Sequence, residues 1–91
     1  MKRISILVSG KVQGVAYRAS TEKVAKEIGL TGFVKNLPDG KVYIEAQGTE
    51  EQLNLFCKWC KRGPMLAVVT DIAITLLDPK EESSFRTVKI S

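Results

Sequence analysis

The sequence predicts an α+β fold, a ferredoxin-like split βαβ sandwich in which an antiparallel-dominated sheet carries two helices on one face. Three observations predict it. Short runs of alternating apolar residues, such as Ile4, Ile6 and Val8, are typical of half-buried strands. Two longer stretches carry apolar residues at helical spacing instead. The expected elements follow in the order β-α-β-β-α-β plus a short edge strand, which is the order of this sandwich.

The first strand and the first helix frame a loop that contains glycines. We expect the strand over residues 3–9, where apolar side chains alternate. The helix begins at Tyr17 or at Ser20, a candidate N-cap, and ends at Ile28 because Gly29 can take the left-handed C-cap position. The face turned to the core then holds Val24, Ala25 and Ile28.

A hairpin follows the first helix. We expect strands over residues 32–36 and 42–46, joined by a turn at residues 37–40. In this turn Pro38 presets φ and Gly40 accepts a positive φ. The turn therefore fixes the pairing of the two strands.

The second half of the chain adds one helix and two strands. Thr49 and Gln52 form a capping box that opens the helix, and Gly63 ends it. Strands over residues 68–76 and 85–90 complete the sheet. The apolar stripe of the helix holds Leu53, Phe56, Cys57 and Cys60. One face of the fourth strand is expected to hold Val68, Thr70, Ile72, Ile74 and Leu76.

Length and composition limit the classes of protein and of active site that this sequence can form. The chain fits one domain with one core, residues 1–91, and its 44% share of apolar residues is ordinary for a globular protein. The apolar run after Met1 is too short for a signal peptide, and no stretch approaches the ~20 apolar residues of a membrane helix. We therefore expect a cytoplasmic protein that does not enter the membrane. The sequence has no histidine, which excludes serine–histidine triads, phosphohistidine intermediates and histidine metal sites.

The connection between the first strand and the first helix has the features of an anion-binding loop. Gly10 and Gly14 let the main chain turn sharply, and successive amides beside a helix N-terminus form a concave set of donors. Arg18 lies near the positive end of the helix dipole, where a cation is unfavourable by about 0.3–1 kcal/mol unless an anion joins it. We interpret the loop as an oxyanion or phosphate cradle with Arg18 as its clamp.

This loop and the hairpin after it resemble the two signatures of the acylphosphatase family. The first signature corresponds to Gly10-x-Val12-Gln13-Gly14-Val15-x-Tyr17-Arg18. The second corresponds to Gly32-Phe33-Val34-Lys35-Asn36, followed by Gly40-x-Val42 and Gly48. The motifs stand in the family's order and spacing, and the similarity extends over nearly the whole chain.

The resemblance implies a freestanding, metal-free acylphosphatase that needs no cofactor. It implies that Arg18 and loop amides bind the phosphate while Asn36 orients the attacking water. An acyl phosphate would be the substrate, and inorganic phosphate would be both product and inhibitor. We expect the enzyme to be a monomer. The phosphate-binding loop implied in this way comprises Gln13, Gly14, Val15, Ala16, Tyr17 and Arg18, with the Tyr17 side chain used for packing.

The predicted fold and the composition support the same chemistry. The first two strands of a βαβ unit run parallel, so Arg18 after the first strand and Asn36 at the end of the second share one edge of the sheet. An ordinary strand-end residue is the alternative interpretation of Asn36. Because no histidine can protonate a leaving group, the chemistry favours an acyl phosphate, whose carboxylate has a pKa of about 4–5 and departs unprotonated. The nucleophile would then be water held by the Asn36 side chain.

Two other patterns have competing interpretations. Cys57 and Cys60 have the spacing of a redox pair, but reactive pairs stand at a helix N-terminus and these lie inside a helix, so we expect buried small hydrophobes. A nucleic-acid-binding module has the same element order and suits a net charge of +4. It needs stacking aromatics on the open sheet face, where the third strand offers only Tyr43, so the sequence argues against this alternative. A domain that keeps the cradle without turnover is a third hypothesis.

Overall fold

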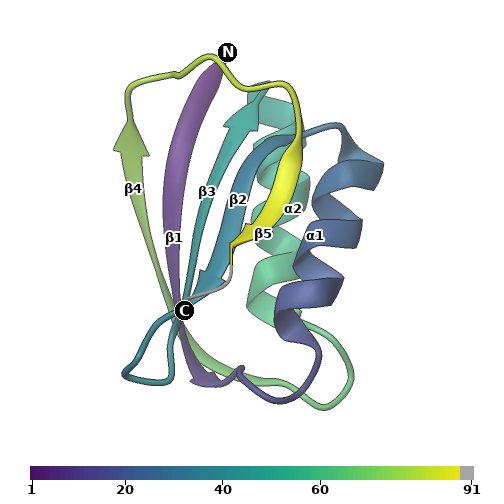
Figure 1. The fold of residues 1–91 in the computed structure, drawn as a ribbon, viewed down its shortest axis with the longest axis vertical. Helices are drawn as coiled ribbons and strands as arrows, with labels where there is room; N and C mark the ends of the chain where they lie inside the picture. The colour runs from purple at the N-terminus through teal and green to yellow at the C-terminus, as the bar shows by residue number, and fades with distance from the viewer. Residues whose placement is uncertain (89–91) are drawn as a thin grey trace.

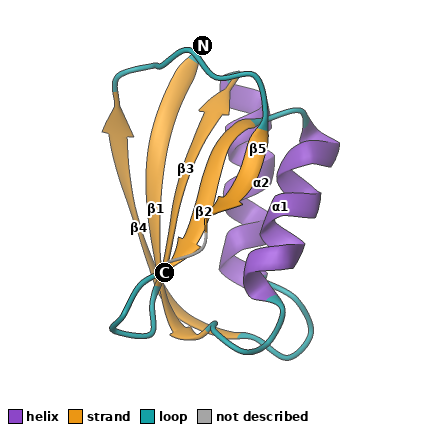
Figure 2. Ribbon diagram, viewed as in Figure 1, coloured by secondary structure: helices purple, strands orange, loops and turns teal. Residues whose placement is uncertain are grey.

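The computed structural model describes residues 1–88 and shows one five-stranded sheet with both helices on the same face (Figures 1 and 2). The strand order is β4-β1-β3-β2-β5, and only the β2–β5 pair is parallel. This is the ferredoxin-like α+β architecture expected from the element order. The elements are β1 (Lys2–Lys11), α1 (Tyr17–Ile28), β2 (Thr31–Asn36), β3 (Val42–Gly48), α2 (Glu50–Arg62), β4 (Val68–Leu77) and β5 (Phe85–Val88).

The core lies between the sheet and the two helices. Alternate residues of β1 and β3 turn to the helices and are buried, as the strand periodicity predicts. Phe56 of α2 is fully buried in this layer and packs edge-on against Phe85 of β5, with ring centroids 6.1 Å apart. The predicted end of the last strand, residues 89–90, lies outside the described residues.

The two helices begin in different ways. Thr49 and Gln52 form the expected capping box, because the Thr49 hydroxyl accepts from the Gln52 amide and the Gln52 side chain accepts from the Thr49 amide. The prediction that Ser20 could cap α1 is wrong. The N-cap is Ala16, and the Ser20 amide already donates to the Ala16 carbonyl at 3.0 Å.

The inward face of α1 is the expected side of the helix, but its most buried residues differ from those predicted. Tyr17, Thr21 and Ala25 are buried, whereas Val24 and Ile28 pack only at the margin of the core. Thr21 is accommodated there because its hydroxyl donates to the Tyr17 carbonyl at 2.7 Å. This hydrogen bond to the backbone offsets the free-energy cost of burying the threonine hydroxyl.

The predicted apolar face of β4 is interrupted by a bulge. Ser9 pairs with Asp71 and Gly10 with Val69, so Thr70 is an extra residue on β4. At the N-terminal end of β4, the alternation of inward and outward residues is therefore the reverse of the predicted one. Val69 packs on the core, while Val68 and Thr70 are exposed. The expectation of one continuous face from Val68 to Leu76 is therefore wrong.

The paths of β1 and β2 place their carboxyl ends at the same edge of the sheet, at the bottom of Figure 1. Both strands pair antiparallel with β3, which lies between them, so they run parallel to each other. The loop after β1 and the last residue of β2, Asn36, consequently meet at this edge, as the topology predicts. Within residues 1–88, neither helix has the length and apolar character needed to cross a bilayer.

Candidate active site

The loop from β1 to α1 adopts a backbone in which two residues have positive φ. Gly14 has φ 74°, and Ala16 has φ 61° with ψ 18°. Left-handed backbone is natural for glycine but costs a residue with a Cβ roughly 1–2 kcal/mol. A non-glycine residue held in this conformation next to a helix start is a feature of ligand-binding loops. The Ala16 conformation directs the chain abruptly into α1.

The amides of this loop and of the first helical turn are free to bind a ligand. The first hydrogen bond of α1 is donated by Ser20, and within residues 1–88 the amides of residues 14–19 donate to no protein acceptor. The methyl side chain of Ala16 cannot cap them, and the first turn holds no acidic side chain. This segment is therefore a row of amide donors at the positive end of a helix dipole, which suits an anion.

Arg18 adds a full positive charge to this row. It is the second residue of α1 and is half-buried. Among the side chains that the structure describes, none forms an ion pair with its guanidinium. A cation at a helix N-terminus is unfavourable by itself, so its placement favours an anionic ligand.

Arg18 and Asn36 line the same pocket, which has a volume of about 210 Å³. Asn36 ends β2, and its side-chain Oδ1 is buried without a hydrogen-bond partner among residues 1–88. A buried unpaired oxygen costs about 1–3 kcal/mol and calls for an explanation. Its position beside the amide row favours a bound molecule as the partner. The pocket is lined by Val12, Gln13, Gly14, Ala16, Tyr17, Arg18, Ala19 and Asn36.

Gln13 has a structural role that the sequence did not reveal. Its Nε2 donates to the carbonyl of Leu37 at 2.8 Å and to that of Lys41 at 2.9 Å. These bonds join the loop to the β2–β3 turn, directly after Asn36. Only the spatial closeness of two distant segments gives Gln13 this function, and no local sequence signal could have found it.

Tyr17 anchors the other end of the loop. Its ring is buried against Trp59, with centroids 5.4 Å apart, and its hydroxyl donates to the Cys60 carbonyl at 2.8 Å. Burial raises the pKa of this hydroxyl well above its ordinary range. Gly63 completes the contact, because a Cβ there would lie 2.8 Å from the Tyr17 ring. The expected packing role of Tyr17 is confirmed.

The side chain of Val15 is buried in the core and does not line the pocket. Val15 can therefore serve a ligand only through its amide. Lys11, at the end of β1, is exposed and lies outside the lining of the pocket.

Neither cysteine lines this pocket. Cys60 is buried as expected, whereas Cys57 is only half-buried, because it faces the open side of α2. Burial raises the pKa of both thiols, and the nearby Lys61 charge offsets only part of the effect at Cys57. Neither has the lowered pKa of a reactive thiol. In the chain up to Val88, no group of three or more His, Cys, Asp and Glu side chains could hold a metal ion.

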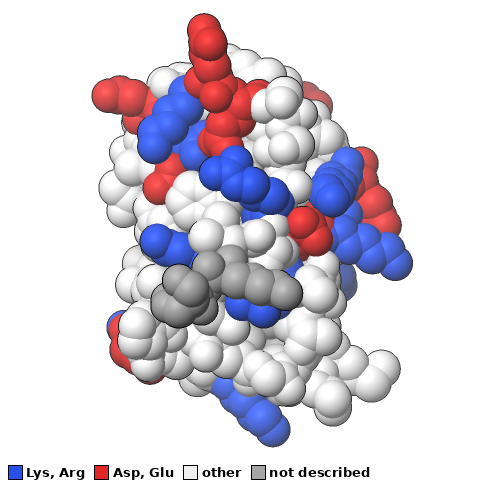
Figure 3. All heavy atoms as spheres, in the orientation of Figure 1, with Lys and Arg blue, Asp and Glu red and all other residues white. Residues whose placement is uncertain are grey.

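The open face of the sheet carries more aromatic surface than the sequence suggested. Phe33 of β2 lies beside Tyr43, with ring centroids 6.0 Å apart. The Lys35 ammonium lies 5.9 Å and 5.6 Å from these two rings, and the Tyr43 hydroxyl donates to Glu45. On the surface drawn in Figure 3, acidic side chains are interspersed with basic ones. This arrangement is not the bare, uniformly basic stacking platform of nucleic-acid-binding sheets.

Comparisons with known proteins agree with the motifs around the pocket. The family model described as Acylphosphatase matches residues 4–87. The chain is 53% identical to the acylphosphatase of Marinobacter nauticus over 88 residues, covering 96% of each chain. It is 46% identical to that of Archaeoglobus fulgidus, covering 93% of this chain and 96% of the relative. The crystal structure of acylphosphatase from Bacillus subtilis is similar with a TM-score of 0.93 and 38% identity, covering 97% of this chain and 99% of that chain.

Proposed function

Because the chain belongs to the acylphosphatase family, we propose that the loop pocket is the place where it hydrolyses acyl phosphates. Membership of this family supports hydrolysis of acyl phosphates as the reaction, in which water splits an acyl phosphate into a carboxylate and inorganic phosphate. One observation carries the assignment of the site. Arg18 from α1 and Asn36 from β2 line one small pocket beside the amides of residues 14–19, which donate to no acceptor among residues 1–88.

In this proposal Arg18 and the amide row bind the phosphoryl group. A guanidinium can form two parallel charge-assisted hydrogen bonds to phosphoryl oxygens, and the amides supply further donors. Phosphoryl transfer needs mainly positioning and stabilisation of the charge on the equatorial oxygens. Donors held in place before the reaction provide this without reorganisation. The left-handed conformation of Ala16 is part of how the loop holds its amides ready.

Asn36 binds the nucleophile rather than the phosphate. The unpaired atom is an acceptor, Oδ1, and a phosphoryl group that has lost its protons also offers only acceptors. A water molecule can donate one hydrogen to Oδ1 and keep a lone pair directed at phosphorus. The buried oxygen thus has a partner when a water molecule occupies the site.

The bond changes then need no protein acid or base. The water oxygen forms a bond to phosphorus as the bond from phosphorus to the acyl oxygen breaks. The electron pair leaves with the carboxylate, whose pKa of about 4–5 makes protonation unnecessary at neutral pH. The proton of the attacking water passes to an oxygen of the phosphate. This route suits a chain that has no histidine.

Hydrolysis of benzoyl phosphate in ¹⁸O-labelled water tests the proposal. We expect the wild-type protein to place the label in inorganic phosphate, because water attacks phosphorus. We also expect the rate to be unchanged by EDTA, and 4-nitrophenyl phosphate, an ester with a poorer leaving group, to react far more slowly. Label in benzoate would mean attack at the carbonyl carbon and would overturn the assigned role of Asn36. Loss of activity with EDTA would contradict the metal-free mechanism.

A further inference from the structure

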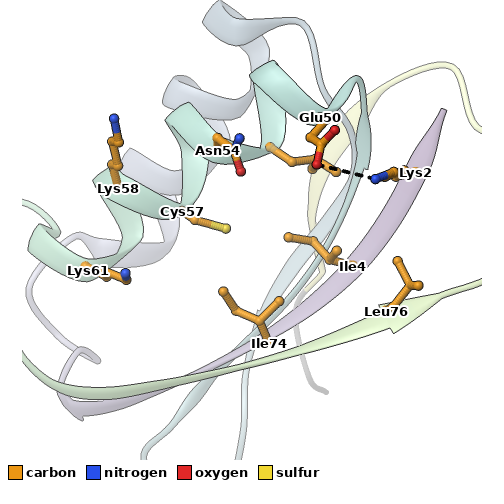
Figure 4. Close-up of a pocket in the computed structure, with 10 residues that line it drawn as sticks. Lys2, Ile4, Glu50, Asn54, Cys57, Lys58, Lys61, Ile74 and Leu76 are labelled. Carbon is orange, nitrogen blue, oxygen red and sulfur yellow. Dashed lines mark ion pairs between the residues drawn. The ribbon is translucent and has the colours of Figure 1, made fainter.

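A second concave surface lies between α2 and β4, separate from the loop pocket. This groove has a volume of about 660 Å³ and shares no lining residue with the loop pocket. Figure 4 shows the Cys57 side chain entering it from α2 and the Ile74 and Leu76 side chains entering it from β4. The volume is within the usual range of small-molecule sites, roughly 300–1,000 Å³.

The floor of the groove is apolar because of the register of the edge strand. Leu76 pairs with Ile4, and Ile74 pairs with Ile6, so both point to the helix side of the sheet. The helices do not cover them: Ile74 is 48% exposed and Leu76 is 73% exposed. Two neighbouring exposed aliphatic side chains in a concave surface can contact an apolar group of a ligand.

The two ends of the groove differ in charge. At one end the Lys2 ammonium lies 3.5 Å from the Glu50 carboxylate, so the charges there compensate. At the other end, none of the acidic side chains within residues 1–88 pairs with Lys61. Lys61 follows Cys57 by four residues, about one turn of α2, and both line the groove. A ligand would therefore meet, at the Lys61 end, an ammonium group that has no ion-pair partner among residues 1–88, with Asp71 lining the adjoining hollow, and an apolar floor beyond it.

We propose that this groove binds an amphiphilic monoanion, specifically a medium-chain carboxylate. The carboxylate lies at Lys61, and the chain runs past Cys57 and Ile74 towards Leu76. Between Glu50 and Lys61 the helix extends for about 16 Å at the α-helical rise, enough for a chain of roughly ten carbons.

The binding of a homologous series tests the apolar part of the site. Hexanoate, octanoate and decanoate are titrated into the protein by calorimetry. Each added methylene that is buried should tighten binding about threefold to fourfold. Decanol, which lacks the charge, should bind more weakly than decanoate. An affinity that does not depend on chain length would overturn the proposal.

Two matched substitutions test the charged end. Lys61→Gln should weaken decanoate binding about threefold to fivefold, as expected for a partly exposed charge contact. Lys23→Gln makes the same change in charge on the exposed surface of α1 and should leave the affinity unchanged. Equal effects of the two substitutions would mean that only net charge matters, and the site would be rejected.

Cys57 reports where the ligand binds. Decanoate should slow alkylation of Cys57 by N-ethylmaleimide in the wild-type protein, with mass spectrometry identifying the modified cysteine. Arg18→Gln should keep both the affinity and the protection, which separates this site from the catalytic pocket. Binding lost in Arg18→Gln, alkylation that decanoate does not slow, or a groove covered by self-association in the free protein would each overturn the proposal.

Discussion

Three residues of the loop pocket are in positions that are unfavourable without a ligand. Ala16 adopts left-handed backbone, Arg18 places a cation at the positive end of a helix, and Asn36 buries an unpaired oxygen. Each costs on the order of 1 kcal/mol. They come from separate parts of the chain and converge on one pocket. Their combination supports a site that is arranged for an anion and a water molecule before either binds.

Arg18→Gln should abolish most of the activity while the fold is kept. Loss of a bidentate, charge-assisted contact to the phosphoryl group should lower kcat/KM by at least about 10²-fold. Benzoyl phosphate kinetics measure this loss, and circular dichroism checks the fold. A folded variant that retains more than about a tenth of wild-type activity would contradict the assignment, since tenfold corresponds to only about 1.4 kcal/mol.

Sulfate provides a binding control for the same variant. It should compete with substrate and raise the melting temperature of the wild-type protein relative to chloride at equal ionic strength. Because sulfate also stabilises proteins generally by exclusion from their surfaces, only the part of the shift that Arg18→Gln loses reports the site. Equal shifts in both proteins would contradict anion binding at Arg18.

Asn36→Ala should separate catalysis from binding. If Oδ1 holds only the attacking water, kcat should fall on the order of 10²-fold while the affinity for inorganic phosphate stays close to that of the wild type. Stability should be unchanged or slightly higher, because the substitution removes a buried oxygen that has no hydrogen-bond partner in the described part of the chain. Asn54→Ala, on the exposed surface of α2, is the matched control. Lost phosphate affinity would make Asn36 a phosphate ligand instead.

At the scale of elements, the pocket depends on how two loops are held together. The β1–α1 loop supplies the amides and Arg18, and the end of β2 supplies Asn36. The Gln13 side chain links them through the carbonyls of Leu37 and Lys41, while Tyr17 fixes the other end of the loop to α2. The geometry between Arg18 and Asn36 is therefore maintained by side chains that do not need to touch the phosphate.

Gln13→Ala should impair catalysis by loosening this link. Its two hydrogen bonds contribute about 1–3 kcal/mol to stability together, and their loss should allow the loop to move relative to Asn36. We expect kcat/KM to fall about tenfold, because small misplacements of catalytic groups are costly. Lys41→Ala keeps the acceptor carbonyl and should have little effect. If both variants retain wild-type kinetics, the link does not position the site.

The sequence predicted those elements whose signals are local. The Thr49 capping box, the alternation in β1 and the glycine at the end of each helix set their elements directly. The start of α1 was left open between Tyr17 and Ser20, and the structure places it at Tyr17. The sequence could not choose between them because the N-cap, Ala16, has no capping side chain and its left-handed backbone comes from the loop as a whole. The bulge at Thr70 arises from pairing between β1 and β4, which periodicity along one strand does not contain. The meeting of Arg18 and Asn36 at one edge of the sheet could be predicted, because the parallel course of β1 and β2 follows from the element order. The link through Gln13 could not, because it depends on contacts between segments that are distant in the sequence.

At the scale of the whole molecule, one end of the sheet carries the loop pocket and the other end carries a cluster of buried ion pairs. The loop pocket lies at the carboxyl end of β1, and a buried ionic cluster lies near its amino end. There Arg3, only 1% exposed, pairs with Glu45 at 2.9 Å and also with Glu82. Gln47 exchanges two hydrogen bonds with the backbone of Lys80, so the connection from β4 to β5 is fixed across the same end. This arrangement stabilises the sheet without involving the residues of the pocket.

The cluster should make stability depend on pH in a way that Glu45 controls. Burial alone would raise the pKa of Glu45, but hydrogen bonds from Tyr43 and Arg3 and the Arg3 charge outweigh it and hold the pKa below its ordinary value of 4.5. A carboxyl group with a lowered pKa in the folded state stabilises the protein above its unfolded pKa. That contribution is lost as the pH falls through the folded pKa.

Glu45→Gln should therefore destabilise the protein at neutral pH, by about 2–4 kcal/mol, because it leaves the buried Arg3 with one carboxylate fewer. The difference from the wild type should shrink as the pH falls below about 4.5, where the wild-type carboxyl group becomes protonated. Urea unfolding at pH 7, 5, 4 and 3 measures both effects, with Glu27→Gln on the exposed surface of α1 as the control.

The activity of the folded Glu45→Gln variant at pH 7 should equal that of the wild type, since the cluster lies at the other end of β1. A difference in stability that stays constant from pH 7 to pH 3 would show that the Glu45 charge does not stabilise this end of the sheet.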